Sequence, residues 1–509
     1  MIIAIMLNCA GCGKNNSKNK NKDAGNYGEN ISIFSYKPDT FCPIASNNEA
    51  NLRMLGIIYD GLISLGDNYV AQPAIAENWE KSADGLVWTI NLRKNATWHD
   101  GSDCLAKDVI YTVNQIKKIE NSPYIYNVSN IAEITETGNR RVKITLQKPS
   151  VNFINLLYFP IIKSGPDEID TANFKPNGTG AYRFEDRNEG NIYYLVRNNR
   201  WWGGKTKVET IEVRMLPGGD TALYAFGSGT IDMTPADNMD WGKFVDPVTA
   251  EYTDIATPIY NFLGINHKNS QLAMSEVRRA ISMVIDRAEL IDEARMGYGI
   301  SANSPVRPEW FVCANQKFDY KPNANGAKKI MEENGWEFKN NIYRKVKDGV
   351  EYKTSFSILI NEDNTIRENL ARIISKNLEE FGIKTNVIRV SYDEYTKRIS
   401  EGDYDMFIGS MVLSPELDFS SLLGEGNMFF FADEEMQFVM AEMQKKGSDS
   451  EIKGTYAEFI NLFEQINPVV GLFFENSVMI YSKQIEGDVV PSYFDVYRGI
   501  DSLEKGAAK

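Results

Sequence analysis

Histidine is nearly absent from this chain, which has only His99 and His267 in 509 residues. Histidine is the usual general acid or base near neutral pH and the commonest metal ligand, so its scarcity leaves little room for either chemistry. Both residues adjoin predicted turns, and we expect them to be surface turn residues. The Gly-x-Ser-x-Gly elbow of one hydrolase class is also missing. We therefore expect a protein that is not an enzyme and that has no metal site and no cofactor.

Positive charge is in deficit, since 69 Asp and Glu against 55 Lys and Arg give a formal net charge of −14. Nucleic acid requires a basic binding face, so we exclude it as a partner. No run of about 18 apolar residues occurs, and the sequence predicts no transmembrane helix. With 43% apolar residues and 509 positions, the chain has the composition of a globular protein with several hydrophobic cores.

Cysteine is also scarce, and its placement suggests a lipid anchor. The apolar residues 1–7 lead to Cys9-Ala-Gly-Cys12, which resembles a bacterial lipobox with Cys12 as the lipidated residue. It departs from that pattern because Cys9 replaces an aliphatic residue and no basic residue precedes the apolar run. The alternative is a plain disordered N-terminus. The other cysteines are expected to be buried as small hydrophobic residues: Cys42, Cys104 and Cys313.

Residues 13–30 are rich in Lys, Asn, Gly and Ser, which predicts a solvated tether. Such a tether after a lipidated cysteine would hold a globular body away from a membrane surface. We therefore expect a protein on the extracytoplasmic face of the cell membrane. The Asn- and Lys-rich composition is a hint of a Gram-positive cell.

The body of the chain, from Ile31, has a mixed α/β pattern. Leu86 to Arg93 alternates like a half-buried strand, and Asp103 fits the N-cap of a helix that follows. In the later half, Thr365 and Glu368 form a capping-box pattern, and short strands and helices alternate. This alternation predicts a parallel sheet, whose ligands bind beyond the carboxyl ends of the strands. The predicted strands are 352–360, 383–390 and 404–408, and the predicted helices are 365–381 and 392–400. The loop Gly409–Leu423 leaves one such end.

Several motifs resemble those of the peptide/nickel solute-binding proteins, family 5. One long match runs from Ala76-Glu-Asn-Trp79 through Trp98-His99-Asp100-Gly101 to Ala106-Lys-Asp108-Val109. Others follow in the family's order, among them Asn177-Gly-Thr-Gly180-Ala-Tyr182, Ile285-Asp286-Arg287 and Asp403-Tyr404-Asp405. The likeness extends from about Ile31 to beyond Pro468.

The resemblance implies an α/β fold, a two-lobed periplasmic-binding-protein-like clamp (type II) with an additional inserted α/β domain. Lobe I would comprise residues 31–70, 178–258 and 474–509, the inserted domain 71–177, and lobe II 259–473. Residues 1–12 would be the lipoprotein signal segment. Two crossing segments, 258–262 and 472–475, would form the hinge.

The function implied is that of a monomeric substrate-binding component of an ABC importer, which captures a short peptide between its lobes and delivers it to permease subunits in the membrane. The backbone of the peptide would pair with both lobes as an added strand does. Other cargoes remain open: a nickel chelate, haem or a sugar. So does a peptide-pheromone sensor, and a hydrolase on an unfamiliar scaffold is the remaining alternative.

The resemblance also suggests ligand-binding residues. Family members that bind peptides place an Asp in the loop after the strand 404–408 to hold the ligand's amino terminus, and here Leu413 stands near that place. Glu416 or Asp418 would take over the role, unless both are loop surface. Further candidates for the cleft walls, each with a core role as its alternative, are Phe34, Tyr36, Tyr260, Asn261 and Met411.

Overall fold

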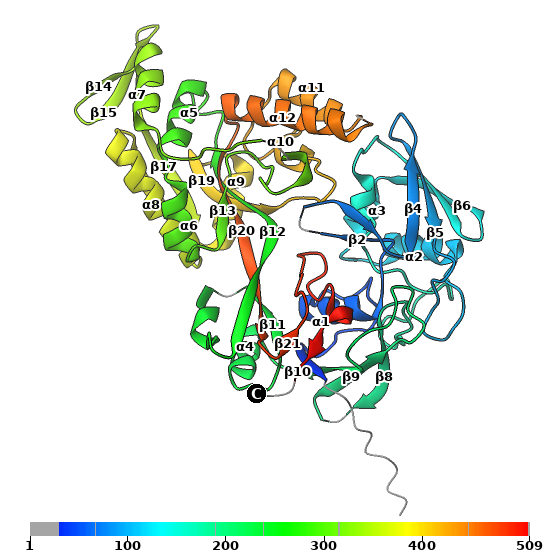
Figure 1. Ribbon diagram of the computed structural model, residues 1–509. Coiled ribbons are helices and arrows are strands. Elements are labelled where there is room, and N and C mark those ends of the chain that lie inside the picture. The colour runs from blue at the N-terminus through cyan, green and yellow to red at the C-terminus, as the bar shows by residue number, and fades with distance from the viewer. Residues whose placement is uncertain are drawn as a thin grey trace, which may run out of the picture.

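The computed structural model describes residues 30–506 except positions 67, 189, 238, 314, 315 and 446. The predicted signal segment with Cys12, and residues 13–29 of the predicted tether, lie outside the described residues. Figure 1 shows two lobes joined by a pair of long strands, with a third body beside them. The α/β clamp with an inserted domain is thus confirmed, while the predicted domain limits stay a prediction. No described helix is both long and apolar enough to span a bilayer.

The lower lobe in Figure 1 contains a four-stranded sheet in the order β1-β10-β9-β8. The first strand, β1, pairs in parallel with β10, which is about 180 residues away in the sequence. The strands are β1 (Ile31–Ser35), β8 (Tyr182–Asn188), β9 (Ile192–Arg197) and β10 (Thr210–Met215), and the helices are α1 (Glu49–Ile58), α4 (Gly219–Gly227) and the 3-10 turn η2 (Met239–Phe244). The chain's last short strands, β21 (Ile485–Glu486) and β22 (Glu504–Lys505), pair with each other.

The third body, which the inserted residues form, has an antiparallel sheet in the order β4-β5-β7-β6. In β5, alternate residues are buried, which confirms the strand predicted from its alternating pattern. The strands are β4 (Ala76–Lys81), β5 (Val87–Leu92), β6 (Ile131–Gly138) and β7 (Arg141–Leu146), with α2 (Ala106–Lys118), α3 (Ile125–Ser129), η1 (Phe153–Leu156) and a small pair, β2 (Ile63–Leu65) and β3 (Ala71–Pro73). The predicted N-cap at Asp103 is wrong, because α2 begins at Ala106 and Asp103 instead forms an ion pair with Arg140.

A seven-stranded sheet in the order β11-β20-β12-β19-β17-β18, with β13 added to β20, begins in the upper lobe and continues along β12 and β20 into the lower lobe, where β11 lies near α4 (Figure 1). The strands of this sheet are β11 (Met233–Ala236), β12 (Ala250–Ile265), β13 (Gly299–Ser301), β17 (Ser355–Asn361), β18 (Lys384–Val390), β19 (Met406–Val412) and β20 (Val470–Ser482). The helices of the upper lobe are α5 (Ser275–Val284), α6 (Arg287–Arg295), α7 (Ala324–Glu333), α8 (Thr365–Phe381), α9 (Tyr392–Glu401), α10 (Ser420–Leu423), α11 (Glu434–Met443) and α12 (Asp449–Ile466). An outlying sheet consists of β14 (Glu337–Lys339), β15 (Ile342–Lys347) and β16 (Val350–Lys353).

The predicted alternation of strands and helices is confirmed, since β17 pairs in parallel with both β18 and β19. Asp286 caps α6, because its side chain accepts the backbone N–H groups of Ala288 and Glu289. At α8, however, the cap is Asn364 rather than Thr365, because the Asn364 side chain accepts the backbone N–H of Arg367. The strand β19 also continues to Val412, so the loop that follows begins four residues later than predicted.

Both histidines are half-buried rather than free surface residues, which corrects the expectation for them. His99 accepts the backbone N–H of Gly178 at Nδ1, and its Nε2 lies 3.1 Å from the carbonyl oxygen of Gly180. The Nε2 atom of His267 lies 2.8 Å from the carbonyl oxygen of Pro468. Burial lowers the pKa of both side chains to about 4, so each is neutral and serves to join chain segments.

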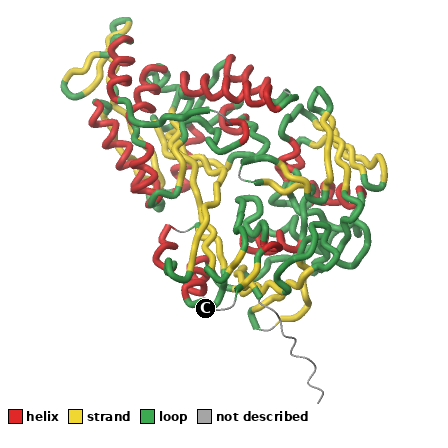
Figure 2. Tube along the Cα trace, viewed as in Figure 1, coloured by secondary structure: helices red, strands yellow, loops and turns green. Residues whose placement is uncertain are grey.

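The two lobes are connected by β12 and β20, which run antiparallel side by side through both (Figures 1 and 2). Their register shifts between Ala256 and Tyr260 and again between Asn261 and Phe262. An irregular register leaves ladder hydrogen bonds unmade and permits local bending. These shifts fall on residues 258–262, the segment predicted to act as a hinge.

Adding a side chain at Gly471 of β20 would test how closely the two crossing strands are packed. A Cβ atom on Gly471 would fall far inside contact distance of the Asn303 carbonyl oxygen and the Tyr260 hydroxyl. We expect Gly471→Ala to destabilise the fold by about 1–3 kcal/mol, the range for overpacked cores, and to lower the melting temperature in a calorimetric scan.

The matched control is Gly454→Ala on α12, where an added Cβ meets no atom within 4 Å. Alanine has the better helix propensity, so this change should leave stability equal or slightly higher, by up to about 1 kcal/mol. An equal melting temperature for Gly471→Ala and wild type would show that the crossing is not closely packed.

Candidate functional site

The loop after β19 reaches from the upper lobe to the inserted body, so that three parts of the chain meet. The side-chain amide of Asn155 donates to the carbonyl oxygens of Tyr69 and Pro415, both at 3.0 Å. The rings of Tyr69 and Trp310 stack with centroids 4.4 Å apart. The contacts of Asn155 with Pro415 and of Tyr69 with Trp310 join segments more than 200 residues apart, and we call this meeting point the lobe junction.

Glu416 is the buried charge of the lobe junction, with 7% of its surface exposed. Its Oε1 accepts the Tyr126 hydroxyl at 2.6 Å, and its Oε2 accepts the Ser150 hydroxyl at 3.1 Å. Burial, together with the charge of Asp418, raises the pKa of the Glu416 carboxyl, against the opposing effect of the two hydroxyl donors. Glu416 therefore fastens the loop of the upper lobe to α3 and its neighbours, and its hydrogen-bonding capacity is used within the protein.

The other predicted residues of this segment have local contacts. Asp418 accepts the backbone N–H and the hydroxyl of Ser420, at 2.9 and 2.6 Å, at the start of α10. Met411 is half-buried in β19 opposite Tyr260 of β12. Asp418 thus shapes the loop, while Met411 lies on the sheet next to the crossing strands.

Tyr260 and Asn261 lie where the crossing strands change register. Tyr260 is fully buried and donates its hydroxyl to the Asn303 carbonyl oxygen at 2.6 Å. Asn261 donates to Glu475 of β20 at 3.0 Å, and the other oxygen of Glu475 pairs with Arg295 at 2.9 Å. This polar chain links β12, β20 and α6 at the crossing.

Phe34 and Tyr36 are placed apart from the other predicted residues, in the lower lobe. Phe34 is buried in an apolar cluster with Phe226 of α4 and Ile480 of β20, and Tyr36 packs against that cluster. The structure thus brings the loop residues and the crossing-strand residues together in the upper lobe but keeps Phe34 and Tyr36 separate from them. The ligand-binding roles of these seven residues stay predictions.

A cavity of about 370 Å³ lies beneath the lobe junction, which the sequence pattern did not reveal. Its walls come from α1, from the segment after it, from the inserted body and from the C-terminal segment near Phe494. The ring of Phe494 contacts Tyr69 at 5.4 Å between centroids, so the cavity adjoins the aromatic stack of the junction. Its acidic lining residues are Glu49, Asp60 and Asp495.

Two of these carboxyl groups have raised pKa values. Burial, opposed by the charge of Arg498 and reinforced by that of Asp60, raises the pKa of Asp495 to about 7. Burial also raises the pKa of Asp60, although Trp202 and Thr179 donate hydrogen bonds to its Oδ2 at 2.8 and 2.9 Å. Nothing in the sequence around Asp60 or Asp495 signals this, because their proximity arises only when the C-terminal segment folds back over α1.

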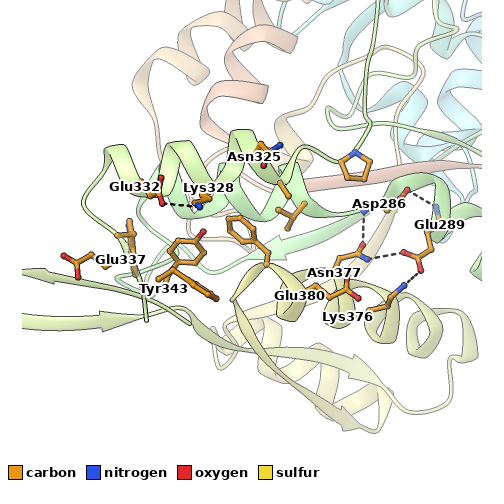
Figure 3. Close-up of a pocket in the computed structure, with 16 residues that line it drawn as sticks. Asp286, Glu289, Asn325, Lys328, Glu332, Glu337, Tyr343, Lys376, Asn377 and Glu380 are labelled. Carbon is orange, nitrogen blue, oxygen red and sulfur yellow. Dashed lines mark hydrogen bonds and ion pairs between the residues drawn. The ribbon is translucent and has the colours of Figure 1, made fainter. Parts of the chain in front are cut away.

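A larger cavity, of about 1080 Å³, lies elsewhere, among α7, α8 and the outlying sheet (Figure 3). All its lining residues fall between Val284 and Phe381, so it belongs to the upper lobe alone. Its charged rim is largely paired: Lys376 and Asn377 both contact Glu289, at 2.7 and 3.1 Å. It is therefore not placed to respond to contact between the lobes.

The groups available at the lobe junction are suited to binding a solute. Within residues 30–506, apart from the six omitted positions, no group of three or more His, Cys, Asp and Glu is placed to hold a metal ion. The lobe junction lies beside the two crossing strands and offers aromatic rings and the buried carboxyl of Glu416. Groups of this kind can bind a solute.

Comparison with known proteins agrees with this description. Residues 70–427 match the bacterial extracellular solute-binding proteins, family 5. Since the match covers more than half of the chain, the protein belongs to this family of solute-binding proteins. The expected resemblance is thereby confirmed.

The relatives differ in what their names say they bind. Oligopeptide-binding protein AppA of Bacillus subtilis is 22% identical, over 96% of this chain and 94% of its own length. Heme-binding protein A of Haemophilus influenzae is 24% identical, over 73% of each chain. A solved nickel ABC transporter structure from Bacillus halodurans has a TM-score of 0.79 at 21% identity and covers 94% of this chain and 100% of its own.

Replacing Glu416 with glutamine tests the state of the carboxyl at the lobe junction. Because its pKa is raised above the ordinary 4.5, the carboxyl stabilises the fold at low pH, and this contribution is lost as the pH rises through the folded-state pKa. We expect the melting temperature of the wild type to fall relative to that of Glu416→Gln as the pH is raised from about 5, as measured by thermal unfolding.

Two variants serve as controls. Asp418→Asn removes a negative charge from the same loop without removing the titrating group at 416. Tyr126→Phe deletes one donor and should cost about 1 kcal/mol in the wild type. Parallel pH profiles for wild type and Glu416→Gln would contradict the raised pKa.

Proposed function

We propose that this protein is the substrate-binding component of an ABC importer and captures short peptides between its lobes. The observation that carries the proposal is the lobe junction, where a loop of the upper lobe meets the inserted body beside two strands of irregular register. The oligopeptide-binding relative, which aligns along almost the whole chain, supports peptides as the cargo. In this proposal, the lobe limits are those expected from the sequence.

Capture requires no bond to be made or broken. The upper lobe swings about residues 258–262 and 472–475, and the junction contacts break and re-form around the ligand. Backbone groups at the exposed edges pair with the peptide as an added strand does. Closure excludes water, which strengthens each charge contact inside. The closed monomer then docks on permease subunits, where the lobes part and release the peptide.

Anchoring belongs to the same proposal. Lipidation of Cys12 and the tether that follows would keep the body at the outer face of the cell membrane. Labelling of growing cells with a radioactive fatty acid tests this, since Cys12→Ser should abolish incorporation and shift the protein from membrane to supernatant. Lipid incorporation that survives Cys12→Ser would contradict the assignment.

The cargo is tested by thermal unfolding of the full chain with pools of di- to pentapeptides. Ligand at about 100 times its dissociation constant stabilises a protein by about 2.7 kcal/mol, which raises the melting temperature measurably. We expect a rise with at least one peptide pool and none with heme or a nickel–histidine chelate. A rise with heme or the chelate alone would transfer the function to that cargo, in line with the relatives of those names.

A further inference from the structure

We propose that the cavity beneath the lobe junction receives a positively charged group of the ligand, an ammonium or a guanidinium. The inference rests on the proposed function and adds to it the chemical class of one end of the cargo. It places the recognition of charge in the lower lobe and the inserted body, away from the loop that carries Glu416 and Asp418.

The charges that line the cavity do not balance. Three carboxylates, of Glu49, Asp60 and Asp495, stand against one guanidinium, of Arg53. Arg53 is already engaged, by Glu49 at 2.5 Å and by Asp237 at 3.2 Å. Among the residues that the structure describes, no ion pair involves Asp60 or Asp495. Two acidic residues that line one cavity, Asp60 and Asp495, therefore lack an ion pair.

The donors that do reach these carboxyls are neutral. Asp60 accepts from the indole of Trp202 and the hydroxyl of Thr179, both at the same oxygen. Asp495 accepts the backbone N–H of Tyr497. The nearby charges are Arg498, which lowers the pKa of Asp495, and Asp60 and Asp501, which raise it. A cation in the cavity would relieve the like-charge repulsion and offset the cost of desolvating both carboxylates.

The walls suit an organic cation. Four aromatic residues line the cavity and are half-buried: Tyr124, Tyr158, Tyr493 and Phe494. Ring centroids lie 6.2 Å apart for Tyr124 and Tyr158, and 5.0 Å apart for Tyr158 and Phe494. Aromatic faces attract ammonium and guanidinium groups, and this attraction adds to that of a carboxylate.

Size and position favour one end of a ligand over a whole ligand. At about 370 Å³, the cavity is near the small end of ligand sites. Phe494 connects it to Tyr69, whose ring stacks on Trp310 of the upper lobe. A peptide held between the lobes can thus extend a basic side chain or its amino terminus past Phe494 toward Asp495.

Calorimetric titration of the full chain with four matched tripeptides tests the inference. The central residue is lysine or norleucine, and the amino terminus is free or acetylated, so that one peptide carries no cation. We expect the peptides with a cation to bind about tenfold or more tightly than the uncharged one, as a charged hydrogen bond would give. Asp495→Asn should remove this preference, and Asp488→Asn should keep it.

A pH series gives a second readout. The acetylated lysine peptide keeps its charge between about pH 6 and about pH 8. The carboxyl of Asp495, with Asp60, Asp501, Arg498, Glu49 and Arg53 around it, titrates near 7 in the free protein. Affinity should therefore fall as the pH is lowered, and Asp495→Asn should flatten the profile. Asp60→Asn is the second variant, and Asp488→Asn, an exposed acid on the same C-terminal segment, is the control.

The outcomes separate the two proposals. Equal binding of charged and uncharged peptides, or a preference that survives both Asp495→Asn and Asp60→Asn, overturns the inference and leaves peptide capture standing. If no peptide binds, the proposed function fails, and putrescine then probes the cavity alone. Putrescine binding that Asp495→Asn abolishes supports the cationic site, and no putrescine binding overturns it.

Discussion

The antiparallel pairing of β12 and β20 is the constraint on which the rest of the structure depends. The chain enters the upper lobe by one strand and leaves it by the other, so both lobes share a single two-stranded crossing. Buried groups hold that crossing, among them Tyr260 on the Asn303 carbonyl and Glu475 between Asn261 and Arg295. The upper lobe also contacts the inserted body through side chains and loops, and Val151 of that body lies in the buried cluster of the upper lobe.

The buried acidic residues are of two kinds. One kind is satisfied by hydrogen bonds within the protein, and the other lacks a counterion. Glu416 has hydroxyl donors on both oxygens, so the fold satisfies it and gains a link between lobes. Asp60 and Asp495 receive hydrogen bonds only from neutral donors, and both line one cavity. A buried charge without a counterion is costly, and proteins retain such groups where something else supplies the opposite charge. The same chemical group therefore has a structural role at one site and is available for recognition at the other.

Local sequence patterns were sufficient to predict most strands and helices, but they did not reveal the cavity lined by Asp60 and Asp495. The alternation in β5 and the strand–helix rhythm from β17 to β19 follow from side-chain periodicity, and both appear as expected. Asp103 and Thr365 failed as caps because Asn364 competes for the same N–H groups at α8, and tertiary pairing with Arg140 engages Asp103. The Asp60–Asp495 pair joins residues more than 400 positions apart. No periodicity carries that information, since it depends on where the C-terminal segment comes to lie.

The three described cysteines have a practical consequence. Cys42, Cys104 and Cys313 are unpaired and buried, and burial raises the pKa of Cys42 to about 11 and of Cys313 to about 12. Thiolates are the reactive species, so these side chains are nearly inert toward maleimides while the protein is folded. With Cys9 and Cys12 replaced, new cysteines on the two lobes would be the only sites to take fluorophores. Because the native thiols would stay unlabelled, the distance between the two lobes could be followed by energy transfer between the added fluorophores.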